Sequence, residues 1–295
     1  MKKFLSVLMA GAMLFGVLTL AGCGDTTTDT GEDTTTTEDT TTTAEFTTVT
    51  EGVLTMSTNA AFPPYEMTDD SGNIVGIDAE IAAAIAEKLG LELQIDDMDF
   101  DGALAAPQSG KSDIVMAGVT VNEERQLVLD FSNTYANGVQ KVIVAEGSDI
   151  TMENLGEQQI GTQKGTTGNI LTTDEFGEDH VIAYDDAIAA VQALNNGQID
   201  CVVIDSAVAD NLVEANPGLT TLDTDYANEE YAIGVAKGNT ALLDAINTAL
   251  QELIDDGTVQ SIIDKYIPTD GTAADEAGTT DEAGATDGAE ADTAA

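Results

Sequence analysis

The sequence is poor in basic side chains. Its 295 residues carry nine lysines and arginines against 54 aspartates and glutamates, for a formal net charge of -45 at pH 7. Such a surface repels nucleic acid and anionic lipid headgroups, so we expect no nucleic acid partner. The charge does not constrain the ligand, because acidity of the exterior is a property of the surface, whereas selectivity depends on a few groups inside a cleft.

Histidine and cysteine are also scarce. The one histidine, His180, follows an acidic, loop-like stretch and is expected to be a solvated loop residue. Cys201 lies in the β-branched run 199–204, which is typical of a buried strand in which a thiol behaves as a small hydrophobic group. Neither a catalytic cysteine nor a fold held by disulfides is expected.

The other cysteine, Cys23, ends an N-terminal targeting segment. Lys2 and Lys3 precede an apolar stretch over residues 4–20, and Leu-Ala-Gly-Cys at 20–23 resembles a bacterial lipobox. By that resemblance residues 1–23 are a lipoprotein signal peptide, and Cys23 becomes the acylated (palmitate-bearing) first residue of an extracytoplasmic, membrane-anchored protein. A membrane anchor formed by the apolar stretch itself is the lesser alternative.

Two segments have almost none of the large apolar side chains that a core needs. Residues 24–48 are dominated by Thr, Asp and Glu and predict a disordered tether, and residues 269–295 predict a disordered acidic tail. Between them lie about 220 residues, enough for one large domain or two lobes.

Strand and helix patterns alternate through this central part. Apolar positions with helical spacing follow Asp78, an expected helix N-cap, and stop at Gly90, an expected helix end. Alternation of this kind favours an α/β architecture with mainly parallel sheets. The expected strands are 53–57, 91–95, 114–116, 142–145, 160–163, 181–184 and 199–204, and the further helices are 188–194 and 242–254.

Polar segments follow several of these strands. In parallel sheets ligands bind beyond the carboxyl ends of the strands. The segments 58–66, 117–125 and 161–168, together with Asp205, occupy that position.

The order and spacing of these segments, with 74–78 and 98–100, resemble the polar amino acid binding proteins of bacterial ABC importers, which belong to solute-binding protein family 3. The resemblance covers residues 49–268 and implies the two-lobed type II periplasmic binding protein fold, with the ligand cleft between the lobes. Lobe 1 would comprise 49–136 and 232–268, and lobe 2 would comprise 137–231. The chain would cross between lobes near 135–139 and 230–233.

The resemblance also implies how an amino acid is held. Arg125, the single arginine, would bind the α-carboxylate bidentately, helped by Thr120 and by the helix start at Thr166 and Thr167. Asp205 would face the α-ammonium from the opposite lobe. The remaining expected ligand-binding residues are Ala117, Gly118, whose carbonyl would assist Asp205, Phe62 and Phe100 around the ligand side chain, and Asn59 and Gln163 at its tip.

Each residue also has an ordinary structural interpretation. Arg125 would pair with a neighbouring acid on the surface, the two phenylalanines would be core residues, and Asp205, Thr166 and Thr167 would cap helices. Gln163 would be an exposed residue at a strand end. These alternatives stay open at the level of the sequence.

One motif imitates a metal site. Residues 97–102, Asp-Met-Asp-Phe-Asp-Gly, match the start of a calcium-binding loop, but the position that needs a bidentate glutamate is Gln108. We therefore expect neither metal nor cofactor. Pro107 falls where the family has a helix and should shorten or kink it.

The amides of Asn59 and Gln163 favour a neutral polar ligand, with glutamine as the best candidate, because an amide does not neutralise a cationic side chain. Arginine, lysine and histidine are the alternative ligands, since Glu66, Asp99 or Asp101 would supply charge if they reach the cleft.

The sequence thus predicts the substrate-binding component of an ABC importer, a monomer that captures a free amino acid by lobe closure and delivers it to a permease and its ATPase. Two other classes remain as alternatives. A cyclohexadienyl-dehydratase-like enzyme would use the same fold, although the expected site holds no histidine or cysteine. A ligand-sensing module is the third.

Overall fold

A computed structural model of the chain describes residues 46–223 and 225–267. The expected signal peptide with Cys23, residues 24–45 of the tether and the acidic tail lie outside the described residues. Within the described ranges, the search for a helix long and apolar enough to cross a membrane finds none.

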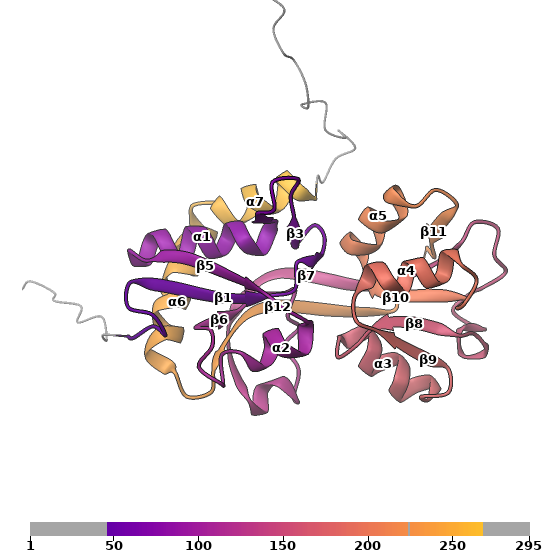
Figure 1. Ribbon diagram of the computed structural model, residues 1–295, viewed down its shortest axis with the longest axis horizontal. Helices are drawn as coiled ribbons and strands as arrows, with labels where there is room; N and C mark the ends of the chain where they lie inside the picture. Colours follow the sequence, from indigo (N-terminus) through magenta and orange to yellow (C-terminus); the bar gives the residue numbers. More distant parts are fainter. Residues whose placement is uncertain (1–45, 224, 268–295) are drawn as a thin grey trace, which may run out of the picture. The chain divides into compact units, whose positions relative to one another are not determined.

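One mixed sheet organises the body of the protein (Figure 1). Its ends are parallel, because β1 pairs in parallel with β5 and β6, and β8 pairs in parallel with β9 and β10. Its middle is antiparallel through β7 and β12, so the expectation of mainly parallel sheets holds only toward the two ends. The order is β5 (Glu92–Asp97), β1 (Val53–Thr58), β6 (Ile114–Val115), β12 (Ala227–Ala236), β7 (Leu129–Ala145), β10 (Cys201–Asp205), β8 (Ile160–Gln163) and β9 (Val181–Tyr184), and β11 (Leu219–Thr221) also pairs with β7.

The helices form two groups, one beside each parallel part of the sheet (Figure 1). The strands β7 and β12 run from one group to the other. The first group is α1 (Ile77–Leu89), α2 (Phe100–Ala105), α6 (Thr240–Asp255) and α7 (Thr258–Tyr266), and the second is α3 (Thr167–Phe176), α4 (Ala187–Asn195) and α5 (Ser206–Ala215). A small sheet of β2 (Ala61–Phe62), β3 (Glu66–Thr68) and β4 (Ile74–Val75) and the short 3-10 helices η1 (Arg125–Leu127) and η2 (Leu155–Glu157) complete the elements.

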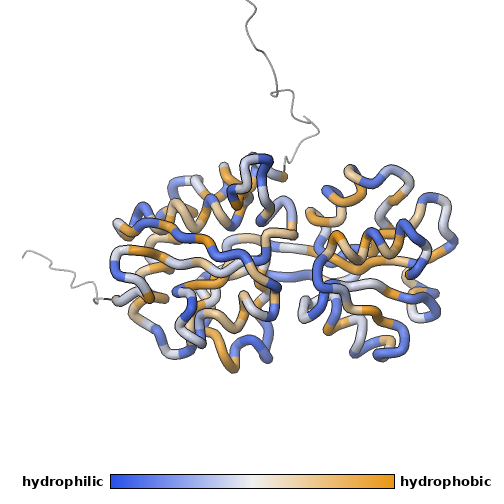
Figure 2. The backbone as a smooth tube through the Cα atoms, in the orientation of Figure 1, coloured by the Kyte–Doolittle hydropathy of each residue, from blue (hydrophilic) through white to orange (hydrophobic). Residues whose placement is uncertain are grey.

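Apolar residues concentrate on the strands and on the helix faces that pack against them (Figure 2). Helix α1 shows why, since Ile77, Ile81 and Ile85 recur at helical spacing and are fully buried. The helix ends at Gly90, whose φ of 69° is the left-handed conformation expected there. The expected N-cap is wrong: Gly76 caps the helix, and Asp78 lies inside the first turn with its side chain buried.

Helix α2 is only six residues long and stops at Ala105, two residues before Pro107. A proline inside a helix removes a backbone hydrogen bond and clashes with the preceding turn, so the expected shortening is present. The strand β7 was expected only over 142–145, because polar residues such as Ser132, Asn133 and Asn137 interrupt the apolar pattern of its first half.

Candidate functional site

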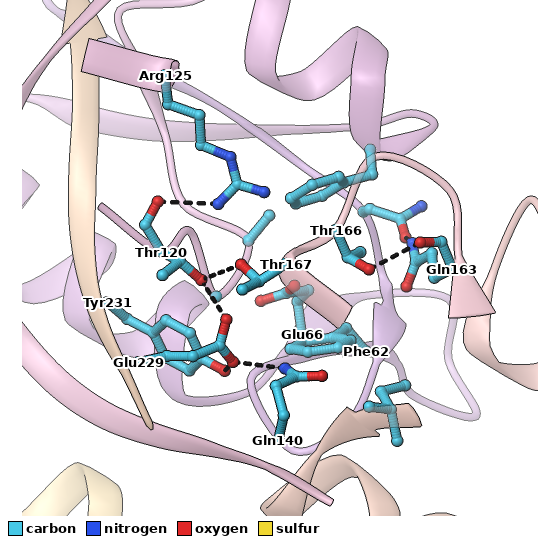
Figure 3. A pocket seen from close by; sticks show the side chains of 15 residues that line it. Phe62, Glu66, Thr120, Arg125, Gln140, Gln163, Thr166, Thr167, Glu229 and Tyr231 are labelled. Atoms are coloured by element: carbon cyan, nitrogen blue, oxygen red, sulfur yellow. Dashed lines mark hydrogen bonds between the residues drawn. The ribbon is translucent and has the colours of Figure 1, made fainter. Parts of the chain in front are cut away.

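A pocket with a volume of about 390 Å³ lies where several strands end (Figure 3). Both groups of elements contribute, since β1 and β6 lead into one side and β8 and β10 into the other. The lining residues are Asn59, Phe62, Glu66, Phe100, Ala117, Gly118, Thr120, Arg125, Gln140, Gln163, Thr166, Thr167, Ile204, Glu229 and Tyr231. Every expected ligand-binding residue except Asp205 is therefore in the lining.

Arg125 is buried at one end of this pocket, with only 6% of its surface exposed. Its Nη1 donates to the Thr120 carbonyl at 2.8 Å and its Nη2 to the Gly165 carbonyl at 3.1 Å, and its Cζ lies 5.3 Å from the centre of the Phe100 ring. Burial lowers the pKa of Arg125 and the charge of Glu229 opposes this, but a guanidinium stays protonated. The alternative of a surface ion pair does not hold for this residue.

Helix α3 begins beside the Arg125 side chain. Thr166 caps it, as the alternative interpretation held, by accepting from the Asn169 amide. Among the described residues the backbone amides of Thr167 and Gly168 have no hydrogen-bond acceptor. Free amides and the positive end of a helix dipole attract anions. Arg125 and this helix start together form what we call the donor end of the pocket.

A chain of hydrogen bonds leads from the donor end to a buried acid that the sequence analysis missed. The Thr167 hydroxyl donates to Thr120 Oγ1 at 2.9 Å, and Thr120 Oγ1 donates to Glu229 Oε1 at 2.6 Å (Figure 3). The other oxygen of Glu229 accepts from Gln140 Nε2 at 2.5 Å and lies 3.0 Å from the Tyr231 hydroxyl. Glu229 and Tyr231 are two positions apart in β12, and this spacing is the signal that would have placed both residues on one face of a strand.

Asp205 lies behind Tyr231 and does not line the pocket. Its Oδ1 accepts from the amides of Ala207 and Val208 at the start of α5, and its Oδ2 lies 2.9 Å from the Tyr231 hydroxyl. Burial raises its pKa to about 6, although these hydrogen bonds act in the opposite direction. Asp205 is thus not in the pocket lining, where it was expected: it caps α5, and Glu66 and Glu229 are the acids in the lining.

The amides of Asn59 and Gln163 contact each other rather than pointing separately into the pocket. Asn59 Nδ2 donates to the Met98 carbonyl at 2.8 Å, which leaves Asn59 Oδ1 to accept from Gln163 Nε2 at 2.9 Å. A backbone carbonyl only accepts, so it sets the orientation of both amides. Gln163 Oε1 is consequently buried without a partner among the described residues.

The same reasoning applies to Gln140. Gln140 Nε2 donates to a carboxylate oxygen of Glu229. Gln140 Oε1 therefore points away from Glu229, and it has no partner in the part of the chain that the structure describes. Each glutamine therefore has a buried Oε1 without a partner among the described residues, and each Nε2 keeps a second N–H beyond the one bond that it makes.

Glu66, the first residue of β3, is fully buried in the lining, and neither carboxylate oxygen has a hydrogen-bond partner among the described residues. Burial first, and then the negative charge of Asp78, raise its pKa well above the ordinary value. Asp78 is also fully buried and accepts from the Gly118 amide at 2.9 Å, and burial raises its pKa to about 6. We call Glu66 and Gln163 Oε1 the acceptor end of the pocket.

The aromatic walls are packed. Phe62 stacks on Tyr65, with ring centres 5.8 Å apart and an angle of 27° between the planes. Gly118 has a φ of 53°, and a β-carbon there would lie 2.8 Å from the Phe62 ring. A side chain at position 118 would therefore displace one wall of the pocket.

The acids of the calcium-like motif have other roles. Asp97 accepts from the Ala60 amide, Asp99 caps α2 by accepting from the Gly102 amide, and Asp101 pairs with Lys164 at 2.8 Å. Neither Asp99 nor Asp101 lines the pocket. Over the described ranges, no group of three or more His, Cys, Asp or Glu residues is arranged to hold a metal ion.

This fold and this pocket are those of a solute-binding protein, and comparison with known proteins agrees. Residues 54–269 match the family described as bacterial extracellular solute-binding proteins, family 3. The chain belongs to this family. It is the substrate-binding component of an amino acid ABC importer, a binding protein rather than an enzyme.

Individual relatives share most of their length with this chain. A "Probable histidine-binding protein" of Neisseria gonorrhoeae is 29% identical, with 93% of this chain and 98% of the relative covered. A mutant of the arginine-binding protein ArgBP from T. maritima is 38% identical, with a TM-score of 0.70, and covers 73% of this chain and 95% of its own. An ancestral arginine-binding protein bound to glutamine is 39% identical, also with a TM-score of 0.70, and covers 74% and 98%.

Proposed function

We propose that the pocket captures a cationic amino acid, with arginine as the best candidate. The observation that carries this proposal is Glu66, a fully buried carboxylate in the pocket lining with neither oxygen paired among the described residues. A buried charge without a partner is costly, and a cationic ligand group removes that cost.

The two ends of the pocket suggest one orientation for the ligand. Its α-carboxylate would lie at the donor end, where Arg125 and the free amides of Thr167 and Gly168 converge. Its α-ammonium would lie near the Gly118 carbonyl and near Glu229. Glu229 would then supply the negative charge that was first expected from Asp205. Its side chain would run between the Phe62 and Phe100 rings to the acceptor end.

Hydrogen-bond matching favours a guanidinium over an amide. The neutral ligand expected from the sequence required Asn59 and Gln163 to donate as well as accept, but one N–H of each amide and the Asn59 oxygen are already used within the protein. The carbonyl oxygen of a glutamine side chain would find no donor at Glu66 while Glu66 is ionised. An unpaired buried acceptor costs about 1–3 kcal/mol, whereas a guanidinium carries only donors. Glutamine remains the second candidate, because an ancestral arginine-binding relative has been solved with glutamine bound.

Capture would occur by closure of a two-lobed type II periplasmic binding protein fold, with lobe 1 as 49–136 and 232–268 and lobe 2 as 137–231. Three hydrogen bonds between these lobes support this: Arg125 to Gly165, Thr167 to Thr120 and Gln163 to Asn59. A ligand that contacts both lobes binds the closed form more tightly and shifts the population toward it.

As a member of an extracellular solute-binding family, the chain functions outside the cytoplasm. We further propose that acylation of Cys23 anchors it to the membrane, where it delivers its ligand to a permease and the associated ATPase as a monomer. A Cys23→Ser variant should be released from the membrane fraction into the medium, and retention there would count against the anchor.

A thermal-shift screen of all common amino acids, followed by calorimetry, tests the ligand. Ligand binding to the folded state raises Tm by mass action, so the tightest ligand gives the largest shift at equal concentration. Arginine should exceed glutamine, and it should also exceed citrulline, which matches arginine in shape but is neutral, by at least about tenfold in affinity. A larger shift with glutamine than with arginine would reject arginine as the preferred ligand.

A further inference from the structure

Beneath the pocket floor lies a cluster of buried polar oxygens without partners. Glu66 comes from β3, Asp78 from α1 and Tyr135 from β7, and all three are at least 95% buried. Both Glu66 oxygens, Asp78 Oδ1 and the Tyr135 hydroxyl have no assigned hydrogen-bond partner among the described residues. Nearly all buried polar atoms in folded proteins are paired, so four such atoms in one cluster require an explanation.

A proton shared between the two carboxyl groups explains two of these atoms. Two carboxylates buried side by side do not both ionise, because repulsion and desolvation push one pKa upward. Once one of them is protonated, it becomes a donor to the other, and two of the unpaired oxygens are satisfied. Glu66 is desolvated and coupled to the charge and side chain of Asp78, which is the arrangement that such sharing needs.

The surroundings indicate which carboxyl holds the proton. Asp78 is stabilised as an anion by the Gly118 amide, which donates to its Oδ2 at 2.9 Å. Among the described residues no donor is assigned to either oxygen of Glu66. The other titratable groups that act on this cluster are acids or phenols from the elements around it: Asp97 of β5, Asp205 of β10, Glu229 and Tyr231 of β12, and Tyr65.

We propose that Glu66 and Asp78 form a proton site coupled to the ligand pocket: Glu66 holds a proton while no cation is present and releases it to solvent when a guanidinium binds. This inference rests on the proposed function. The exchange conserves charge, since one positive charge leaves the acceptor end as another arrives. The guanidinium keeps its own proton because arginine is not deprotonated in proteins.

The proton also widens the range of ligands. A neutral ligand leaves Glu66 protonated, and its hydroxyl then donates to the ligand's side-chain carbonyl. The acceptor end thereby offers a carboxylate to arginine and a donor to glutamine without any change in the fold. Binding of arginine should consequently depend on pH, while binding of glutamine should depend on it much less.

Calorimetry in two buffers of different ionisation enthalpy, phosphate and Tris, counts the protons released at pH 7. We expect close to one proton per arginine and about none per glutamine. Equal counts for the two ligands would overturn the inference. If arginine binds without releasing a proton, the proposed function stands and this inference fails, whereas failure of arginine to bind at all rejects the proposed function.

Two variants separate the roles of the carboxyls. Glu66→Gln removes the titrating group, so proton release on arginine binding should disappear and arginine affinity should fall more than tenfold. Asp78→Asn keeps an oxygen for the Gly118 amide and places an amide donor beside Glu66. Glu66 should then stay ionised without a ligand, so proton release on arginine binding should also disappear. Persistent release in both variants would place the proton elsewhere and overturn the assignment.

The wild-type protein supplies the same test if a variant fails to fold. Over the pH range in which Glu66 titrates, the dissociation constant for arginine should fall by up to about tenfold per pH unit as the pH rises. The constant for glutamine should stay flat or rise. A flat profile for arginine would contradict the proton site.

Discussion

The donor end and the acceptor end of the pocket differ in how their polar groups are held. Arg125 at the donor end is held by hydrogen bonds to two backbone carbonyls and lies against the Phe100 ring. Glu66 at the acceptor end is equally buried but has no partner among the described residues. One end is preorganised, and the other is incomplete without a ligand or a proton.

This difference matches what each end has to recognise. Every amino acid carries the same α-carboxylate, so a rigid donor end suits all of them equally. Side chains differ, and discrimination is strongest where buried groups are left unpaired by the wrong ligand. The donor end would therefore supply affinity that is common to all ligands, and the acceptor end would supply specificity.

The largest expected effect is at the donor end. Arg125→Ala should weaken every amino acid ligand by about 100-fold or more, because it leaves a buried carboxylate without its charged partner. Arg125→Lys should recover only part of the loss, since an ammonium does not reproduce the planar bidentate contact. Calorimetry with arginine and glutamine measures both variants.

Lys164→Ala is the matched control for Arg125→Ala. It also removes a cation, but this one is exposed at the rim of the pocket. Its effect should be small for both ligands. An Arg125→Ala protein that retains wild-type affinity would eliminate the donor end as the carboxylate site.

The second largest effect should depend on the ligand. Glu66→Gln should weaken arginine by about 10- to 100-fold, as expected when a buried charged partner is removed, and should weaken glutamine less. Glu230→Gln makes the same change at an exposed acid in the same protein and should leave both affinities unaltered. If Glu66→Gln weakened the two ligands equally, the proposed division between the ends would be wrong.

The donor end was largely predictable from the sequence. A lone arginine in a very acidic chain and Gly-Thr-Thr-Gly after a predicted strand mark its residues, although the arginine by itself also fits a surface ion pair. The strands 160–163 and 181–184 and the helix end at Gly90 were confirmed, because their signals are local apolar runs and a glycine. Local patterns transfer well from sequence to structure.

The acceptor end was not predictable in the same way. Asn59 and Gln163 are 104 positions apart, and their mutual hydrogen bond uses one N–H of Gln163 and the side-chain oxygen of Asn59, which the sequence alone leaves free. Glu229 belongs to β12, which pairs with β7. Polar residues in the first half of β7 interrupt its apolar pattern, so this pairing is not recognisable from the sequence. Asp205 was expected in the lining because an acid at a strand end can either cap a helix or contact a ligand. Only the structure shows that Tyr231 lies between its carboxylate and the pocket.

The variant Glu229→Gln tests whether Glu229 contributes to the binding of every amino acid or only to that of arginine. Glu229→Gln should weaken arginine and glutamine alike, by about tenfold, because it removes the charge that would face the α-ammonium while keeping the shape of the side chain. Calorimetry with both ligands gives the ratio. A loss restricted to arginine would instead assign Glu229 to the acceptor end.

The unliganded protein allows a smaller test through stability. Below the ordinary pKa of 4.5, Glu66 is protonated in both the folded and the unfolded chain. At higher pH the unfolded chain loses this proton first, because burial keeps the folded pKa raised. The free energy of unfolding contributed by Glu66 therefore falls as pH rises from 4.5 toward the folded pKa, by about 1.4 kcal/mol per pH unit at most.

Glu66→Gln should remove this pH dependence. Its Tm should match that of the wild type near pH 4.5 and exceed it increasingly toward neutral pH when no ligand is present. Asp78, with a folded pKa of about 6, contributes with the same sign over a narrower range and does so in both proteins to a first approximation. A Tm difference that stays constant from pH 4.5 to 8 would show that Glu66 does not titrate in the folded protein.

The smallest expected effect is at the pocket rim, where Lys164 and Asp101 form an exposed ion pair across the proposed lobe boundary. An exposed pair contributes about 0.2–1 kcal/mol and is screened by salt, so Lys164→Ala should speed ligand release about threefold or less, and less still at high ionic strength. Lys88→Ala, which breaks an ion pair with Glu252 away from the pocket, is the control and should not alter release. Stopped-flow displacement measures these rates. A tenfold or larger effect of Lys164→Ala would mean that rim closure, rather than the two ends of the pocket, determines how long the ligand is held.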